Sequence, residues 1–119
     1  YDISNCKMRY LYEYNYPSTQ TVTGTTSVNT GTWKHLTWVK TGTSLIMYID
    51  GVQDFSATLL TNVTGFVNSV GTLWGPCNAS PFYTSLFNGQ MANIMCYSVA
   101  LSSAQVLQNY NAQKFRFGK

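Results

Sequence analysis

Acidic residues are the first candidates for chemistry, and the sequence has only four of them: Asp2, Glu13, Asp50 and Asp54. Cleavage of a glycosidic bond needs two carboxyl groups that face the same bond. Asp50 belongs to an Asp-Gly pair that predicts a tight hairpin turn, and Asp54 follows just beyond it. No two of the four acids stand at alternate positions of one predicted strand. We therefore predict that the protein is not an enzyme and has no catalytic residues.

A nucleophilic triad would have to use His35, because it is the only histidine in the chain. His35 lies in a predicted strand beside Trp33 and Thr37. The sequence has neither an elbow-type nucleophile motif nor a glycine-rich phosphate loop. We interpret His35 as a hydrogen-bonded structural residue.

The three cysteines, Cys6, Cys77 and Cys96, allow one disulfide and leave one thiol, with three possible pairings. Cys96 lies in an apolar run and is expected to be buried. Cys77 lies in a Gly-Pro-Cys-Asn loop, from which it could reach a partner. The spacing does not choose between the pairings. No Cys-x-x-Cys motif and no Cys/His cluster occurs, so the sequence predicts no metal site.

Aromatic and amide side chains gather in or near one long predicted loop, from Trp74 to Leu86. Sugars stack on aromatic faces and bond to amides, and binding residues often lie on loops above a rigid sheet. An alternative is that Trp74 and Phe82 cover the core. The candidate carbohydrate-binding residues are Trp74, Asn78, Tyr83 and Asn88.

Asn62-Val63-Thr64 fits the acceptor pattern for N-glycosylation, which makes Asn62 the candidate glycosylation site. Asn78-Ala79-Ser80 fits it too, but Pro81 makes that triplet a poorer acceptor. Such triplets also arise by chance.

The charge balance excludes several classes of partner. The 119 residues suit one domain, only 9% of them are charged, and the net charge is +3. Nucleic-acid binding needs a concentrated basic face, but the basic residues are scattered outside the basic, Phe-rich tail at 113–119. No run approaches the ~20 apolar residues of a membrane helix. We expect no nucleic-acid partner and no membrane span.

Short strands dominate the predicted elements, as the Thr-, Tyr- and Val-rich composition favours. Asp50-Gly51 between apolar runs predicts a type I′ hairpin inside a three-stranded meander over 32–55. Residues 19–28 are expected to form either one Thr-rich strand or a pair of short strands broken at Gly24. The alternation in Lys114-Phe115-Arg116-Phe117 predicts an exposed β-arm. The expected strands cover 6–14, 19–28, 32–40 and 44–49, the last two within the meander, and then 65–70 and 91–99.

One short helix is expected, from Ser103 to Asn111. Ser102 and Gln105 have the spacing of a capping box, and Leu101 and Val106 that of a hydrophobic staple. A helix of this length is unstable alone and must pack against a sheet. Its apolar stripe is expected to continue through Ala104, Leu107 and Tyr110.

Two stretches together resemble the concanavalin A-like lectin/glucanase superfamily in its laminin-G branch. Residues 31–52, GTWKHLTWVKTGTSLIMYIDGV, are similar to the family's Trp-His strand and its Leu-Tyr-Val-Asp-Gly hairpin. Residues 87–102, FNGQMANIMCYSVALS, are similar to the strand that leads into the family's short C-terminal helix. The resemblance covers about residues 31–112, and the ending resembles versions found in virus and phage surface proteins. It implies an antiparallel β-sandwich of the jelly-roll type with one short C-terminal helix.

The resemblance also sets expectations for ligands and partners. Many members bind calcium, but Ala92 and Asn93 stand where the family often has Asp-Glu, so no cofactor is expected and calcium is a lesser possibility. Members usually carry further strands before this segment. The chain is thus either one complete domain over 1–119 or the C-terminal two-thirds of one. A sheet that lacks strands exposes unpaired edges, so we expect copies of the chain or a strand-completing polypeptide as partners.

Two functions remain open at this point. One is a non-catalytic structural subunit of an extracellular filament, capsid, virion or surface layer. The alternative is a lectin-like module that recognises glycans. Both place the protein outside the cell or on a virion or cell surface.

Overall fold

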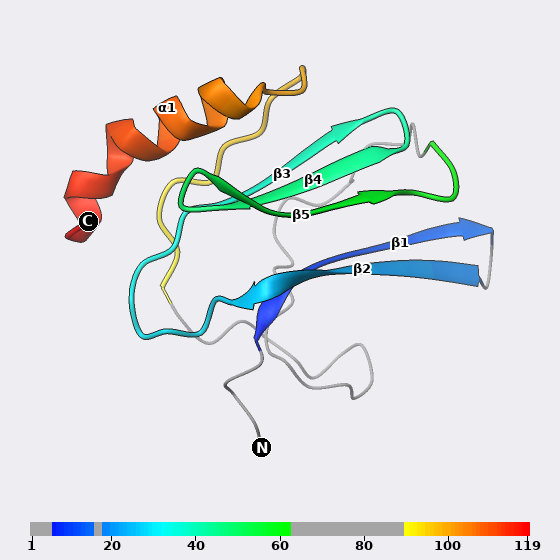
Figure 1. Cartoon of the computed structure of the whole chain (residues 1–119), viewed down its shortest axis with the longest axis horizontal. Helices are drawn as coiled ribbons and strands as arrows, with labels where there is room; N and C mark the ends of the chain where they lie inside the picture. Colours follow the sequence, from blue (N-terminus) through cyan, green and yellow to red (C-terminus); the bar gives the residue numbers. More distant parts are fainter. Residues whose placement is uncertain (1–5, 16–17, 63–89) are drawn as a thin grey trace.

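The computed structural model describes residues 6–15, 18–62 and 90–119. Five strands and a C-terminal helix followed by a short 3₁₀ turn make up these segments, as Figure 1 shows. The strands form antiparallel pairs in two sheets, one of two strands and one of three. The elements are β1 (Lys7–Asn15), β2 (Ser18–Ser27), β3 (Leu36–Thr41), β4 (Ser44–Ile49), β5 (Val52–Thr58), α1 (Ser103–Gln113) and η2 (Lys114–Phe117).

The three-stranded sheet is the central layer, with one partner on each face (Figure 1). On one face, Leu45, Met47 and Ile49 of β4 pack with Met8 of β1 and Val22 of β2. On the other face, side chains of β3 and β4 pack against α1. Alternate residues of β4 thus point into two apolar interfaces, as the period of a strand requires. The predicted all-β fold with one short C-terminal helix is confirmed.

The β1–β2 hairpin follows the predicted alternation. Met8 is buried and Tyr10 is half-buried, whereas Lys7 and Arg9 are exposed. β2 runs without interruption through Gly24, so the alternative of a strand broken there is wrong. An added Cβ at Gly24 would collide with the carboxylate of Asp54 on β5. Glycine is needed here because a side chain from the neighbouring sheet comes against the backbone.

The central sheet confirms the predicted meander, but it starts at Leu36 instead of residue 32 and ends at Thr58 instead of residue 55. Asp50 and Gly51 have φ values of 53° and 80°, as a type I′ turn needs. β3 begins at Leu36, so the expected start at residue 32 is wrong. Lys34 and His35 come before the strand because their contacts go to the Asp50 turn rather than to a neighbouring ladder.

The tryptophans of this region are not core residues. Trp38 lies opposite Met47 in the β3–β4 ladder, so both side chains point to the same face of the sheet. Met47 is fully buried, but Trp38 keeps 38% of its surface exposed, and Trp33 keeps 37%. Trp38 is a sheet-face residue at an edge that the β1–β2 layer leaves uncovered.

Helix α1 begins as predicted and ends two residues later, at Gln113 rather than Asn111. The Ser102 hydroxyl accepts a hydrogen bond from Gln105 N–H at 3.3 Å, and the Gln105 side chain accepts one from Ser102 N–H at 2.8 Å. The capping box is therefore confirmed. Leu101 and Val106 pack in the same cluster with Tyr48.

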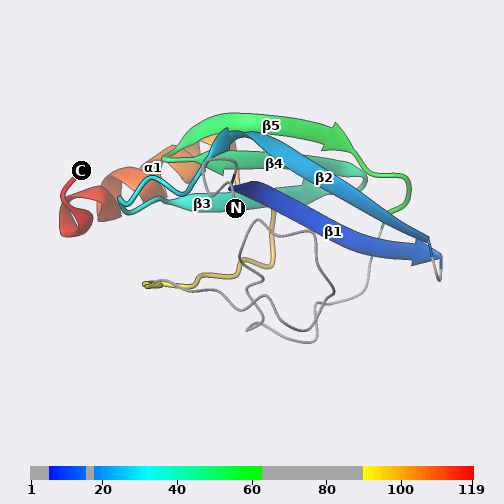
Figure 2. The same ribbon diagram turned by 90° about the horizontal axis from the view of Figure 1, so that it is seen from below.

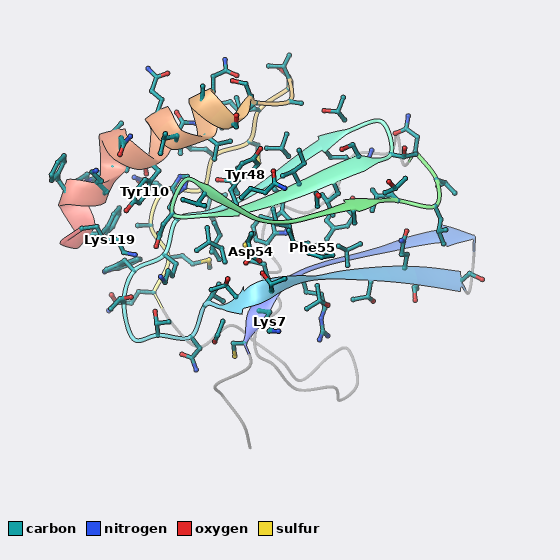
Figure 3. All side chains as sticks on the ribbon, in the orientation of Figure 1. Lys7, Tyr48, Asp54, Phe55, Tyr110 and Lys119 are labelled. Atoms are coloured by element: carbon teal, nitrogen blue, oxygen red, sulfur yellow. The ribbon has the colours of Figure 1, made fainter. Side chains whose placement is uncertain are left out.

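The buried face of α1 differs from the predicted stripe. Val106 is the fully buried residue of the helix, whereas Ala104 and Leu107 are exposed. The helix docks through the staple residue because Tyr48 and Val39 offer their apolar surface at its first turn. In Figure 3 the labelled Tyr48 lies on the side of the sheet that faces α1.

Two predicted β segments have other structures. Residues 91–99 are not a strand, and they pair with none of the described strands. The tail forms the 3₁₀ turn η2 instead of a β-arm, and it ends at Gly118 with φ of 70°. The expected strand at 65–70 lies outside the described residues.

Candidate functional site

Asp54 is the extra residue of a β-bulge in β5. Its neighbours Gln53 and Phe55 pair with Tyr48 and Met47, and Asp54 itself has no ladder partner. A bulge redirects a side chain, and here it sends the carboxylate toward β2, as Figure 3 shows. Asp54 therefore joins the two layers of the sandwich.

The carboxylate of Asp54 accepts three hydrogen bonds from β2. The donors are Thr25 N–H at 2.9 Å, the Thr25 hydroxyl at 2.7 Å and Thr26 N–H at 3.0 Å. Burial raises the pKa of Asp54, but the hydrogen bonds from Thr26 and Thr25 outweigh it, and the net pKa is lowered. An ionised carboxylate held by backbone donors is a structural anchor.

Asp50 holds together three parts of the chain at the β4–β5 turn. One carboxylate oxygen accepts His35 N–H at 3.0 Å. The other oxygen accepts the ammonium groups of Lys34 at 3.1 Å and Lys119 at 2.6 Å. Burial raises the pKa of Asp50, but the hydrogen bonds from His35, Lys119 and Lys34 lower it by more than burial raises it. The net pKa is lowered, which favours the ionised carboxylate. We call Asp50, Lys34 and Lys119 the Asp50 clasp.

His35 is half-buried beside this clasp. Burial lowers the pKa of His35, and the charge of Asp50 opposes that shift only in part. Its ring lies 6.0 Å from the ring of Tyr110, measured between centroids, and its Nδ1 lies 3.5 Å from the Thr37 hydroxyl. These contacts fit the structural role that we predicted for His35.

An aromatic and basic surface surrounds the clasp. The rings of Trp33 and Phe117 lie 4.8 Å apart between centroids. The ammonium of Lys114 lies 5.6 Å from the centre of the Tyr110 ring, within the range of cation–π attraction. Sequence reasoning missed this surface. The basic, Phe-rich tail was its only signal, and the alternation of that tail suggested a strand instead.

Residues 90–100 form an exposed apolar segment before α1, which we call the 90–100 segment. No backbone hydrogen bond joins it to another described segment. Side-chain contacts hold it to α1: Asn109 donates to the Tyr97 hydroxyl at 3.0 Å, and Asn93 donates to Gln113 at 3.2 Å. Its large exposed side chains are those of Met91, Ile94, Met95, Tyr97 and Val99.

The predicted site residues fall partly outside this description. The four carbohydrate candidates Trp74, Asn78, Tyr83 and Asn88 lie outside the described residues, as does Cys77. Asn62 is exposed, and its side-chain oxygen accepts a bond from the Lys40 ammonium at 3.0 Å. Cys6 is disulfide-bonded.

Cys96 is a free and exposed thiol, so the expectation that it is buried is wrong. None of the described strands pairs with the apolar run around it.

Within residues 6–15, 18–62 and 90–119, no group of three or more His, Cys, Asp or Glu side chains has the geometry to hold a metal ion. None of the helices in these segments has the length and apolar composition needed to cross a bilayer.

Comparison with known protein families shows which family the chain belongs to. Residues 2–107 match the model of a laminin-G family of the concanavalin A-like lectin/glucanase superfamily. The chain belongs to this family. The resemblance predicted from residues 31–112 is therefore confirmed, and the match reaches further toward the N-terminus than those motifs do. Curated protein sequences yield no match.

The laminin-G-like domain is also similar to a solved structure. This is the S-layer domain-containing protein from Clostridium thermocellum ATCC 27405, residues 221–444, at a TM-score of 0.58 and 22% identity. The similarity covers 87% of this chain and 51% of that chain, so the chain spans about half of its length. At this identity the likeness shows a shared fold.

Proposed function

We propose that this laminin-G-like domain is a non-catalytic assembly module of an extracellular surface structure, such as a surface layer, filament or capsid. The observation that carries the proposal is the 90–100 segment, in which five large apolar side chains are between 43% and 69% exposed. Contiguous exposed apolar surface is a property of sites that bind other proteins. A chain with only 9% charged residues has little charge with which to oppose such contacts.

The family and the solved neighbour support this proposal. The similar Clostridium thermocellum protein is an S-layer domain-containing protein, which fits a place in a surface layer. We extend a location in a surface layer, and a role in its assembly, to the present chain. The two aspartates with described side chains support the non-catalytic part, since Asp50 and Asp54 are both occupied by structural partners.

The native mass of the full chain tests the proposal. We expect gel filtration with light scattering to show oligomers or polymers whose population grows with protein concentration. A mass equal to one chain at every concentration, up to those of a dense surface array, would rule the assembly role out.

Glycan recognition is the second candidate, favoured by the aromatic and basic surface around the Asp50 clasp. Trp33 is partly exposed beside Phe117, and Phe115 is 78% exposed, so aromatic faces are open to a sugar ring. A glycan array probed with the full chain tests it. Loss of binding in Trp33→Ala, with Trp38→Ala as the matched control, would place the site at the clasp. Loss in Trp74→Ala or Tyr83→Ala would place it at the residues predicted from the sequence.

A further inference from the structure

The net positive charge of the chain is concentrated on the aromatic and basic surface around the Asp50 clasp. The basic residues of this surface are Lys34, Lys114, Arg116 and Lys119, and Asp50 is bonded to two of them. These five residues have a formal charge of +3, which equals the formal charge of the whole chain. The other three basic and three acidic residues cancel. A region that carries all of the net charge attracts negatively charged ligands.

Two of these cations lie beside aromatic rings. The ammonium of Lys114 lies 5.4 Å from the centre of the Phe115 ring and 5.6 Å from that of Tyr110. The guanidinium carbon of Arg116 lies 5.9 Å from the centre of the Phe117 ring. A ligand that stacks on one of these rings therefore meets a positive charge next to it.

Both kinds of group are open to a ligand. Phe115 is 78% exposed, Trp33 is 37% exposed, and Arg116 is exposed as well. Figure 2 shows the C-terminal turn and the loop before β3 at the same end of the molecule. The Asp50 clasp fixes these two segments to each other, because it bonds Lys34, next to Trp33, to the end of the tail. The fold therefore brings the parts of this surface together.

Ring faces and cations together match an acidic polysaccharide. The apolar face of a sugar ring stacks on an aromatic face, and a carboxylate or sulfate on the sugar forms charge-assisted bonds with Lys or Arg. Two amides of α1, those of Asn109 and Gln113, are already bonded to the 90–100 segment. A neutral sugar depends on amides for its hydrogen bonds, whereas an acidic sugar can use Lys114 and Arg116.

The Asp50 carboxylate disfavours nucleic acid as the ligand. Nucleic acid has a phosphate at every nucleotide and is bound along a continuous basic groove. Here Lys34 and Lys119 share one carboxylate oxygen of Asp50, so part of the positive charge is already neutralised. In a polysaccharide the charges are separated by whole sugar rings, which can lie on the aromatic faces.

We propose that the aromatic and basic surface binds an acidic polysaccharide. Trp33 and Phe115 lie against its sugar rings, and Lys114 and Arg116 pair with its carboxylate or sulfate groups. This proposal rests on the glycan-recognition candidate described above and narrows it to negatively charged glycans. It is compatible with the assembly role, which uses the 90–100 segment instead.

Binding of the full chain to immobilised dextran, dextran sulfate and carboxymethyl-dextran tests the charge requirement, because the three polymers share one backbone. We expect binding to both charged polymers that weakens as salt is added. Binding to dextran should be at least about tenfold weaker, the loss expected from one charge-assisted bond. Poly-glutamate, a single-stranded DNA oligonucleotide and phosphatidylserine/phosphatidylcholine vesicles are acidic probes of other classes, and each should bind several-fold more weakly than dextran sulfate.

Paired charge variants test the location of the site. Lys114→Gln with Arg116→Gln should weaken binding to dextran sulfate by at least about tenfold. Lys7→Gln with Arg9→Gln is the matched control, because it removes the same charge from exposed residues of β1. The control should weaken binding by less than about twofold, since salt screens charges far from the site.

Phe115→Ala tests the aromatic contribution without disturbing the core, because Phe115 is largely exposed. It should weaken binding to dextran sulfate several-fold, as should Trp33→Ala. Val52→Ala, which alters a residue that is 68% exposed, is the control and should leave binding unchanged.

Equal binding to dextran and to both charged polymers would overturn the proposal, while leaving the glycan candidate standing. Equal losses in the two double variants, or unchanged binding in both Phe115→Ala and Trp33→Ala, would also overturn it. Equal or tighter binding of poly-glutamate, DNA or vesicles would show a surface for another class of anion. No binding to these polymers or to any glycan on the array would remove both the proposal and the glycan candidate.

Discussion

At the scale of single residues, two aspartates stand out because the charge of each holds other parts of the chain in place. Asp54 accepts hydrogen bonds from β2 in the other layer, and Asp50 forms ion pairs with two lysines. Both carboxyl groups have a lowered pKa because the folded chain supplies donors to the charged form. Their contribution to stability is present above the ordinary pKa of 3.8 and is lost as the pH falls through the lower folded values.

The substitution Asp54→Ala tests the link between the two layers. Removing the carboxylate leaves the Thr25 and Thr26 N–H groups without this acceptor, and we expect a loss of about 1–3 kcal/mol in the free energy of unfolding. Urea denaturation measures it. Gln53, the neighbour of Asp54, is exposed, so Gln53→Ala should change the free energy of unfolding by less than ~0.5 kcal/mol. Equal effects of the two substitutions would show that Asp54 does not join the layers.

His35 should produce a separate acid-dependent step. Its folded pKa is below the ordinary 6.5, mainly because of burial, so the unfolded chain binds the proton more tightly. Stability is therefore greatest above the unfolded value, and it decreases as the pH falls through 6.5 toward the folded pKa. The urea midpoint should drop between about pH 7.5 and about pH 5.

The control for this step is His35→Gln, which removes the only histidine and should abolish the drop. The aspartates do not contribute in this range, since their pKa values lie below 3.8 in the folded chain. An undiminished drop in His35→Gln would assign the step to another group.

At the scale of elements, the β4–β5 hairpin and α1 touch at a glycine. A Cβ on Gly51 would lie 2.9 Å from Leu107 Cδ1 and 3.1 Å from Tyr110 Cδ1. A side chain at residue 51 would therefore force Leu107 and Tyr110 of the helix to shift. The same residue satisfies the positive φ of the turn, so two separate requirements meet at one position.

Paired substitutions separate these requirements. Gly42 has φ of 56° and nothing within 4 Å of an added Cβ, so Gly42→Ala measures the backbone strain alone, about 1–2 kcal/mol. Gly51→Ala should lose a further ~1–3 kcal/mol through overpacking against α1. Thermal unfolding of both variants measures the extra loss of stability in Gly51→Ala. Adding Leu107→Ala to Gly51→Ala should reduce this extra loss. A Gly51→Ala loss no greater than that of Gly42→Ala would contradict the close packing.

Local signals predicted most of these elements well. The Asp50-Gly51 pair fixed the hairpin because few residues accept positive φ, and Ser102 with Gln105 fixed the start of α1 because their bonds span a single turn. The 91–99 segment was predicted wrongly for the opposite reason. Its alternation allows a strand, but a strand also needs a neighbouring edge, which no pattern within the segment contains.

At the scale of the whole molecule, the Asp50 clasp joins the C-terminus to the central sheet. Lys119 lies 69 residues from Asp50 in sequence, and Figure 3 shows the labelled Tyr110 and Lys119 near the β4–β5 turn. The clasp orders the tail that carries Phe115 and Phe117, and so it shapes the aromatic and basic surface.

Asp50→Asn tests the clasp without disturbing the turn, because asparagine also accepts positive φ. We expect faster amide hydrogen exchange in residues 114–119 and a loss of about 1 kcal/mol that shrinks at high salt. Asp54→Asn, whose side chain bonds to β2 rather than to the tail, is the matched control and should leave exchange in the tail unchanged. Unaltered tail exchange in Asp50→Asn would show that other contacts order the C-terminus.

The sequence by itself determined the fold class, the hairpin, the capped helix and the family, because these depend on the period of side chains and on bonds between near neighbours. The tertiary structure alone decided that Asp54 crosses to β2, that the tail closes on Asp50, and that Cys96 and Trp38 are exposed. Each of these depends on which distant segments meet. Contacts between distant segments depend on how whole layers pack, so a local sequence pattern cannot predict them.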